Sequence, residues 1–233
     1  MDAQSRFDSK QSFVLDVPAV TSIWETLQKS DFQVEAVMDC GDGISRRTTL
    51  LNDVVNYSNP PKAQLESVKF HGYNRSKGNY ATVFVGAEHS INLSFSLTGT
   101  AVQVSDTRER LVNIFDSIKP WYDRVTKLDF FVVLGLILIF GGMYSTLLSQ
   151  SKPKADYTPL QAFYILGGSV ALVVSGAALA WFLNKARSKI FPKAVFQIGH
   201  GIRREEFSEK IRWCVVVAFV VSIAAAFAFK PFS

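Results

Sequence analysis

The chain has 233 residues, of which 48% are hydrophobic and 19% are charged, and this composition excludes a disordered or collagen-like chain. Its two cysteines exclude a disulfide scaffold or a cysteine-based zinc site, and three dispersed histidines argue against a histidine metal site. The net charge of +5 arises in residues 129–233, where basic residues flank apolar segments, a pattern typical of membrane proteins rather than DNA-binding ones.

The N-terminal half is predicted to form one domain, preceded by a short N-terminal segment. Residues 1–11 contain no apolar core, so we expect no signal peptide and a flexible N-terminus there. Residues 12–118 combine short alternating runs with amphipathic stretches. They predict a compact cytosolic α+β domain, an antiparallel sheet with helices packed on one face.

Within this domain we expect elements in the order β-α-β-β-α-β-β-β-α. A strand at residues 13–17 precedes a helix that has Pro18 in its first turn and apolar residues at helical spacing. Gly41-Asp42-Gly43 predicts a hairpin turn between the next two strands, and Asn59-Pro60-Pro61 ends a short second helix. Three further strands at 64–72, 80–86 and 90–97 precede a last helix at 107–118.

Three long apolar segments follow a linker at residues 119–129. Residues 130–149, 160–184 and 213–229 are free of charged side chains, and each segment approaches the roughly 20 residues that cross a hydrocarbon core as a helix. The third segment extends back to Ile211 if the side chain of Arg212 reaches out to the interface. Buried helices of a soluble protein are the alternative, and three such segments in one half of a chain argue against it. We expect an all-α membrane domain at 130–229, with three transmembrane helices at 130–149, 160–184 and 211–229 and a tail at 230–233.

The loops indicate the orientation of these spans. The cytosolic loop expected at 185–210 is strongly basic, whereas the loop between the first two spans holds only Lys152 and Lys154. The positive-inside rule places the N-terminus in the cytoplasm and the C-terminus outside the cell (inner) membrane. Aromatic and basic residues at the cytoplasmic span ends are expected at the membrane interface. They are Trp121, Trp181, Trp213, Lys185, Arg187, Lys189, Lys193 and Arg212.

The basic loop also contains apolar residues between Ile190 and Ile198. They predict a short interfacial helix or elbow that follows Pro192 and lies on anionic headgroups. Gly199 and Gly201 would break this helix, and a charged helix at 203–212 would then lead into the third span.

Small residues recur at four-residue spacing within the spans, which lets helix backbones approach closely in lipid. They would pack either within one chain's three-helix bundle or between chains, and we expect a homo-oligomer. No Asp, Glu, Lys, Arg or His lies within 130–149, 160–184 or 213–229, which argues against a secondary transporter and leaves an oligomeric pore or a plain anchor. The packing residues are Gly141, Ser145, Gly167, Ala171, Ser175, Gly176, Ala180, Ala218, Ser222 and Ala226.

No Walker-type loop, GxGxxG, GxSxG, HExxH or CxxC motif occurs. We therefore expect no enzymatic activity, cofactor or metal. Two cationic surface features could bind a small anionic ligand such as a nucleotide, although solvated loops carry similar charges, and no nucleic acid is expected as a partner. These features are the hairpin residues Lys69, His71, Tyr73, Arg75 and Lys77, and the pair Arg46 and Arg47.

A small cytosolic α+β domain fused to a few charge-free spans resembles the general plan of bacterial membrane effectors in anti-phage defence. The resemblance implies a domain that senses a ligand or partner and rearranges an oligomeric transmembrane bundle, with a channel-like effect on the membrane. The alternative is a membrane anchor or scaffold, in which the domain recruits a cytosolic partner protein and the spans only localise it.

Overall fold

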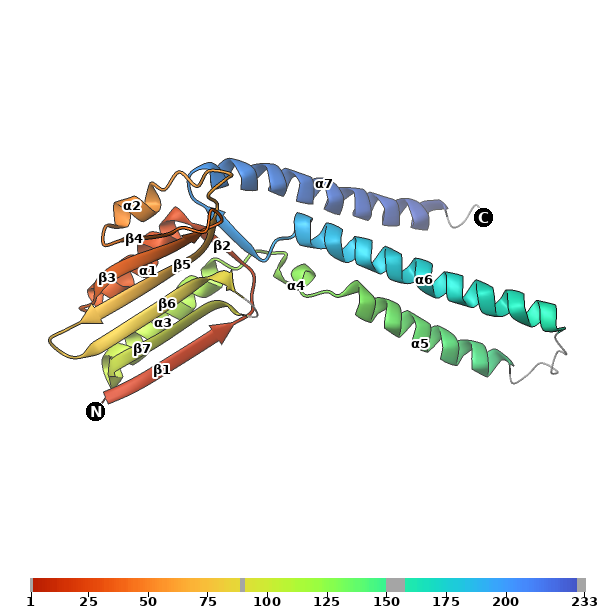
Figure 1. Ribbon diagram of the computed structural model, residues 1–233, viewed down its shortest axis with the longest axis horizontal. Helices are drawn as coiled ribbons and strands as arrows, with labels where there is room; N and C mark the ends of the chain where they lie inside the picture. The colour runs from red at the N-terminus through yellow and green to blue at the C-terminus, as the bar shows by residue number, and fades with distance from the viewer. Residues whose placement is uncertain (1, 89–90, 150–157, 230–233) are drawn as a thin grey trace. The chain divides into compact units, whose positions relative to one another are not determined.

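The computed structural model describes residues 2–88, 91–149 and 158–229 (Figure 1). The chain divides into two compact units. The first combines residues 1–123 with residues 190–233, and the second comprises residues 124–189. The segment that follows the second apolar helix therefore belongs with the N-terminal domain, whereas the sequence grouped it with the membrane domain.

The first unit is built on a six-stranded sheet in which all neighbouring strands are antiparallel, as predicted. The strand order is β1-β7-β6-β5-β3-β4 (Figure 1). The strands are β1 (Asp2–Ser9), β3 (Gln33–Cys40), β4 (Ser45–Thr48), β5 (Leu65–Asn74), β6 (Asn79–Glu88) and β7 (Ile91–Thr100).

Strand β1 corrects the expectation of a flexible N-terminus. Residues 2–9 pair with β7 along their whole length. The Phe7 ring stacks on Phe95 at 5.2 Å and thereby packs against the core. The other core-facing residues of β1 are small or polar, and for this reason the sequence carries no clear strand signal.

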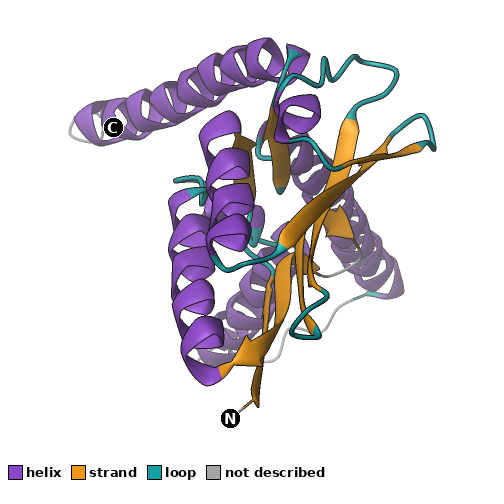
Figure 2. Cartoon of the chain, turned by 90° about the vertical axis from the view of Figure 1, so that its left-hand side faces the viewer, coloured by secondary structure: helices purple, strands orange, loops and turns teal. Residues whose placement is uncertain are grey.

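Helices α1 (Val17–Lys29) and α3 (Ala101–Ser117) pack against each other on one face of the sheet, as expected (Figure 2). Asp16 caps α1, since its carboxylate accepts a hydrogen bond from the Ala19 amide at 2.8 Å. The short helix α2 (Leu51–Val55) follows β4. Helix α3 begins six residues before the predicted position because the Thr100 hydroxyl caps it.

A second, two-stranded parallel sheet completes this domain. It pairs β2 (Phe13–Asp16) with β8 (Ala194–Gln197), which lies far along the chain (Figure 1). Phe196 and Ile198 are buried in the same core as Phe13, and the rings of Phe13 and Phe196 meet edge to face at 5.5 Å. The interfacial helix predicted after Pro192 is therefore wrong, because these apolar residues cover the domain core.

Helix α7 (His200–Phe229) begins after a short turn that follows this strand, and it then runs unbroken for 30 residues. The charged helix expected at 203–212 is thus continuous with the third apolar segment, as predicted.

The second unit contains the helices α5 (Phe130–Ser149) and α6 (Pro159–Ile190), which follow the single turn α4 (Asp123–Thr126). Asn184 of α6 holds the start of α5. Its side chain accepts a hydrogen bond from the Phe130 amide at 3.2 Å and donates one to Asp129 at 2.9 Å.

One stretch of the described residues, Leu166–Ile190, is long and apolar enough to cross a membrane. The stretch Phe130–Tyr144 is apolar but shorter. Many large apolar side chains of both helices are exposed, with Phe140 at 64% and Phe163 at 72%. The arrangement of three transmembrane spans stays a prediction.

Candidate functional site

The predicted ligand-binding residues occupy two faces of the sheet. Lys69, His71 and Tyr73 alternate along β5 and lie on the face opposite the helices, because Val68 and Phe70 between them point into the core. Arg47 lies on this same open face, since both it and Lys69 pair in register with Val37. Arg46 lies on the helix side, since it pairs in register with the buried Met38.

Four of the five cations in this set pair with a carboxylate. The pairs are Arg46–Asp42 at 2.6 Å, Arg47–Glu35 at 2.8 Å, Lys77–Asp31 at 3.0 Å and Lys69–Asp39 at 3.8 Å. The structure therefore brings the open-face residues together but compensates most of their charge. Within the described part of the chain, Arg75 has no ion pair.

Asp39 is the most heavily bonded carboxylate on this face. It accepts hydrogen bonds from Ser45 at 2.5 Å and Ser67 at 2.7 Å, and Lys69 lies nearby. The hydrogen bond from Ser45 and these other contacts hold the pKa of Asp39 below its ordinary value.

Because the carboxylate is favoured in the folded protein, the stability that Asp39 contributes is present above its unfolded pKa. It is lost as the pH falls below about 4 and passes through the lowered folded pKa. We expect Asp39→Asn to lower the melting temperature at pH 7 and to flatten its decline at acidic pH. Thermal unfolding from pH 7 to pH 3 measures this, and an unchanged acid slope would contradict it. Asp8→Asn, on the exposed edge strand, is the control.

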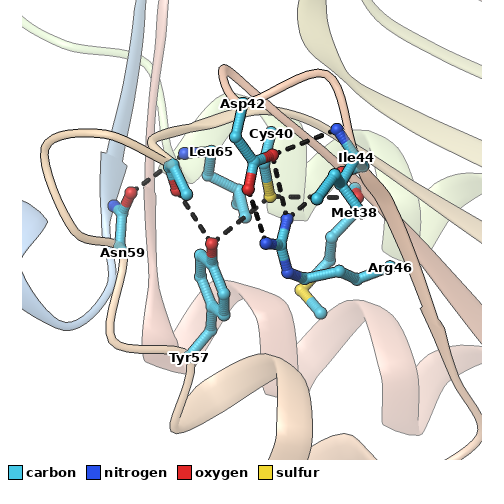
Figure 3. A network of polar contacts seen from close by, with 9 residues as sticks. Met38, Cys40, Asp42, Ile44, Arg46, Tyr57, Asn59 and Leu65 are labelled. Atoms are coloured by element: carbon cyan, nitrogen blue, oxygen red, sulfur yellow. Dashed lines mark hydrogen bonds and ion pairs between the residues drawn. The ribbon is translucent and has the colours of Figure 1, made fainter.

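On the helix side, a polar network joins the β3–β4 hairpin to the loop that follows α2 (Figure 3). The Arg46 guanidinium lies 5.7 Å from the centre of the Tyr57 ring. The Tyr57 hydroxyl accepts a hydrogen bond from the Cys40 thiol at 3.4 Å and donates to the Ala63 carbonyl at 2.8 Å. Burial, reinforced by Cys40, raises the pKa of Tyr57 to about 12. Cys40 is a free and buried thiol.

The loop of residues 56–64, which we call the Asn59 loop, carries this network to the start of α7. The buried Asn59 amide accepts a hydrogen bond from the Leu65 backbone at 2.9 Å and donates to the carbonyls of Phe196 and Ile198. Arg204 donates to the Asn59 carbonyl at 3.1 Å. The sequence analysis treated Asn59 only as part of a helix terminator and missed this role.

A glycine makes the contact possible. Gly199 has a φ of +53°, and a Cβ there would overlap the carbonyl oxygens of Tyr57 and Ser58. The next residue, His200, donates its amide to the Ser58 carbonyl at 2.9 Å. The Asn59 loop therefore fixes the turn between β8 and α7 through backbone and side chain together.

We expect Asn59→Ala to lower the free energy of unfolding by about 3 kcal/mol, since three buried hydrogen bonds at about 1 kcal/mol each are lost. Asn59 has a φ of +48°, so strain in alanine would add to the loss. Asn59→Gly removes the same hydrogen bonds without that strain and serves as the matched variant. Denaturation in detergent compares them, and a wild-type midpoint for both would contradict the assigned role.

An ion pair inside the first unit marks the base of the apolar part of α7. Arg212 is 1% exposed and Glu205 is 6% exposed. Arg212 donates hydrogen bonds to the Glu205 carboxylate and, at 3.3 Å, to the Ile190 carbonyl. Its guanidinium lies 4.7 Å from the centre of the Tyr122 ring. The side chain of Arg212 is thus buried within the protein, and its expected position at the membrane interface stays a prediction.

Burial dominates the electrostatics of this group. It raises the pKa of Glu205, and the positive charge of Arg212 opposes the shift. Burial, together with the negative charge of Glu205, raises the pKa of Tyr122 to about 12. Among the described residues, Arg212 Nε and the Tyr122 hydroxyl have no hydrogen-bond partner. The free energy of the buried Arg212 charge therefore depends strongly on the positions of its partners.

Aromatic rings surround the ion pair. The rings of Trp121 and Trp213 stack at 5.6 Å, and Phe191 contacts both Trp121 and Tyr122. Trp121 and Trp213 are each 53% exposed. Two tryptophans that the sequence assigned to one interface are thus brought together from distant parts of the chain. In the second unit, Trp181 is exposed and Lys185 lies over its ring at 4.9 Å.

The predicted packing residues differ in their surroundings. Gly176 faces Leu134 of α5 closely, and Ala180 is 4% exposed. Gly141 and Gly167 have open space where a side chain would lie. Ala171, Ser175, Ala218 and Ser222 are exposed. The side chains of Ser145 and Ala226 lie outside the described part of the structure. The remaining interface residues, Arg187, Lys189 and Lys193, follow in the basic segment around the end of α6.

No protein-family model matches the chain, and neither a curated protein nor a solved structure shows a significant similarity to it. The chain forms an α+β domain whose core is completed by a segment that follows two apolar helices. This segment leads, through a short turn, into the third apolar helix.

Proposed function

We propose that this is an integral membrane protein in which a cytosolic sensing domain is coupled to an oligomeric transmembrane bundle that perturbs the membrane. The observation that carries the proposal is the continuity of α7. The helix starts in the turn held by the Asn59 loop, passes the buried Arg212 and continues into the apolar segment without a linker.

The pairing of β2 with β8 supports the proposed topology. Residues 13–16 and 194–197 are hydrogen-bonded neighbours and must lie on the same side of a membrane. The chain between them therefore crosses an even number of times. If Leu166–Ile190 spans the membrane, α5 must span it as well, although its described apolar part is shorter. The third apolar segment then ends on the opposite side, as the positive-inside rule favours.

The buried ion pair supports coupling between the domain and the third span. Arg212 contacts Glu205 on its own helix, the Ile190 carbonyl at the end of α6, and the ring of Tyr122. Three chain segments thus meet at one buried charge. A change in the domain that displaces Tyr122 or the Asn59 loop would change the relative free energies of alternative positions of α7.

The exposed small residues support assembly of several chains. Gly141 and Gly167 have open space beside them among the described residues, and Ala171 and Ser222 are exposed, so all four leave room for close approach by another helix.

The second candidate is a membrane anchor that recruits a cytosolic protein. The open polar face of the sheet favours it, because Tyr73 and Tyr80 are opposite each other in register there and each is 47% exposed. In this case the apolar helices would hold the domain at the membrane without conducting or leaking.

One experiment separates the two candidates. The full chain is reconstituted in nanodiscs to measure the mass of the assembly, and in dye-loaded liposomes to measure leakage. We expect a ring of several 25.9 kDa chains, and leakage that changes when exposed small residues of the apolar helices are replaced. A monomer that leaves the liposomes tight would overturn the proposal and favour the anchor. Gly167→Leu and Ser222→Leu test the packing residues, with Leu172→Ile as the control.

A further inference from the structure

The edge of the sheet next to the β5–β6 hairpin is incomplete. Strand β4 pairs with β3 only along Ala36–Asp39, so residues 33–35 of β3 have no strand neighbour on that side within the described chain. A hollow of about 370 Å³ lies here, within the roughly 300–1,000 Å³ typical of small-molecule sites. Its lining residues are Gln33, Val34, Glu35, Thr49, Tyr73 and Arg75.

Tyr73 supplies an aromatic wall. Its ring stacks on His71 at 6.3 Å with an interplanar angle of 20°, and 47% of the residue is exposed. Because Tyr73 is the register partner of Gln33, its ring belongs to the same part of the sheet as the unpaired end of β3. An exposed ring that is supported from one side can stack on a planar ligand from the other.

Arg75 supplies a positive charge, without an ion pair among the described residues, on a hairpin that hydrogen bonds connect to the turn after α1. Asn74 bonds to the backbone of Asp31 at 2.9 Å and to Ser76 at 2.7 Å, and Lys77 pairs with Asp31. Arg75 lies among these residues, yet it makes no ion pair within the described residues. A planar guanidinium in this position can bind a phosphate with two hydrogen bonds.

We propose that this hollow binds a nucleotide, with the base stacked on Tyr73 and a phosphate held by Arg75. The backbone groups of residues 33–35 that face away from β5 offer hydrogen bonds to the edge of the base, and Glu35, which also lines the hollow, pairs with Arg47. A peptide added to β3 would find only three free residues before β4 begins, which is too short for strand addition.

This inference rests on the proposed function, because it names the ligand class that the cytosolic domain would sense. The positive charge comes from one side chain rather than from the whole predicted set. Lys69, Lys77, Arg46 and Arg47 already interact with carboxylates, so they do not form the cationic patch that the sequence suggested.

The test uses the full chain in nanodiscs and the fluorescent nucleotides mant-ATP and mant-GTP. We expect saturable binding of at least one of them. Tyr73→Ala and Arg75→Ala should each weaken it at least about tenfold. Tyr73→Phe keeps the ring and should bind like the wild type. Lys77→Ala, on the same hairpin but paired with Asp31, is the matched control.

Inorganic pyrophosphate and anionic lipid in the nanodisc are the competing anions. Displacement of the nucleotide by equal concentrations of pyrophosphate, or by the lipid, would overturn the assignment of a base to Tyr73. Failure of both nucleotides to bind, or binding that Tyr73→Ala and Arg75→Ala leave unchanged, would overturn the site. The mass of the assembly and liposome leakage are measured without nucleotide. A negative result for nucleotide binding would therefore overturn this inference without deciding the proposed function.

Discussion

A protein cut after residue 123 will lack a cooperative unfolding transition, although it retains every strand of the large sheet. The cut removes β8, which leaves β2 without a partner and exposes the core that Phe196 and Ile198 cover. Deleting a buried phenylalanine costs about 3–5 kcal/mol and a buried isoleucine about 2–5 kcal/mol. Together these losses are comparable with the roughly 5–15 kcal/mol total stability of a small domain.

The measurement is urea unfolding followed by tryptophan fluorescence, since Trp24 lies in the core. A matched protein joins residues 1–123 to residues 190–210 through a flexible Gly/Ser linker and restores β8 without the long apolar helices. We expect this second protein to unfold cooperatively. Equal unfolding midpoints for the two proteins would show that β8 is dispensable.

Removing the charge at Arg212 will have the second large effect. In Arg212→Ala, the Glu205 carboxylate stays buried without its partner, and breaking a buried pair in this way costs about 3–5 kcal/mol. Arg212→Lys keeps the charge but cannot reproduce the forked contacts with Glu205 and the Ile190 carbonyl, so we expect partial loss. Thermal unfolding of the full chain in detergent measures both changes.

Two controls make the result specific. Lys210→Ala lies on the same helix at an exposed position and should change the stability by less than about 0.5 kcal/mol. The double variant Glu205→Leu with Arg212→Met removes both charges and should recover much of the stability lost in Arg212→Ala. A double variant no more stable than the single one would show that Arg212 acts through packing on Tyr122 instead.

Local sequence patterns were sufficient to predict the elements that bury one face of a single helix or strand. The apolar stripe of α1, with Pro18 in its first turn, predicted the helix correctly. The alternation in β7 predicted its strand, with Leu93, Phe95 and Leu97 buried. In these elements the periodicity of the residues and the direction of burial come from the same short segment.

Patterns failed where a strand depends on a distant partner. In β1, Phe7 is the one large apolar residue on the core-facing side, and the segment becomes a strand by pairing with β7, which lies far along the chain. In β8, four residues next to basic ones suggested a membrane surface because β2 lies far away in the sequence. For the site, the sequence showed the cations Arg47 and Lys69, but the carboxylates that pair with them lie on a neighbouring strand and depend on strand register.

The parallel pairing of β2 and β8 also sets an order of events during synthesis. A ribosome adds about 5–20 residues per second, so roughly 10–35 seconds separate the appearance of the two strands. During this interval the strands of the large sheet and the helices α5 and α6 are synthesised, while Phe13 and Leu15 lack the cover that Ala194–Gln197 later provides. Closure of the domain therefore follows production of α6, and a chain released early displays an open core to chaperones and proteases.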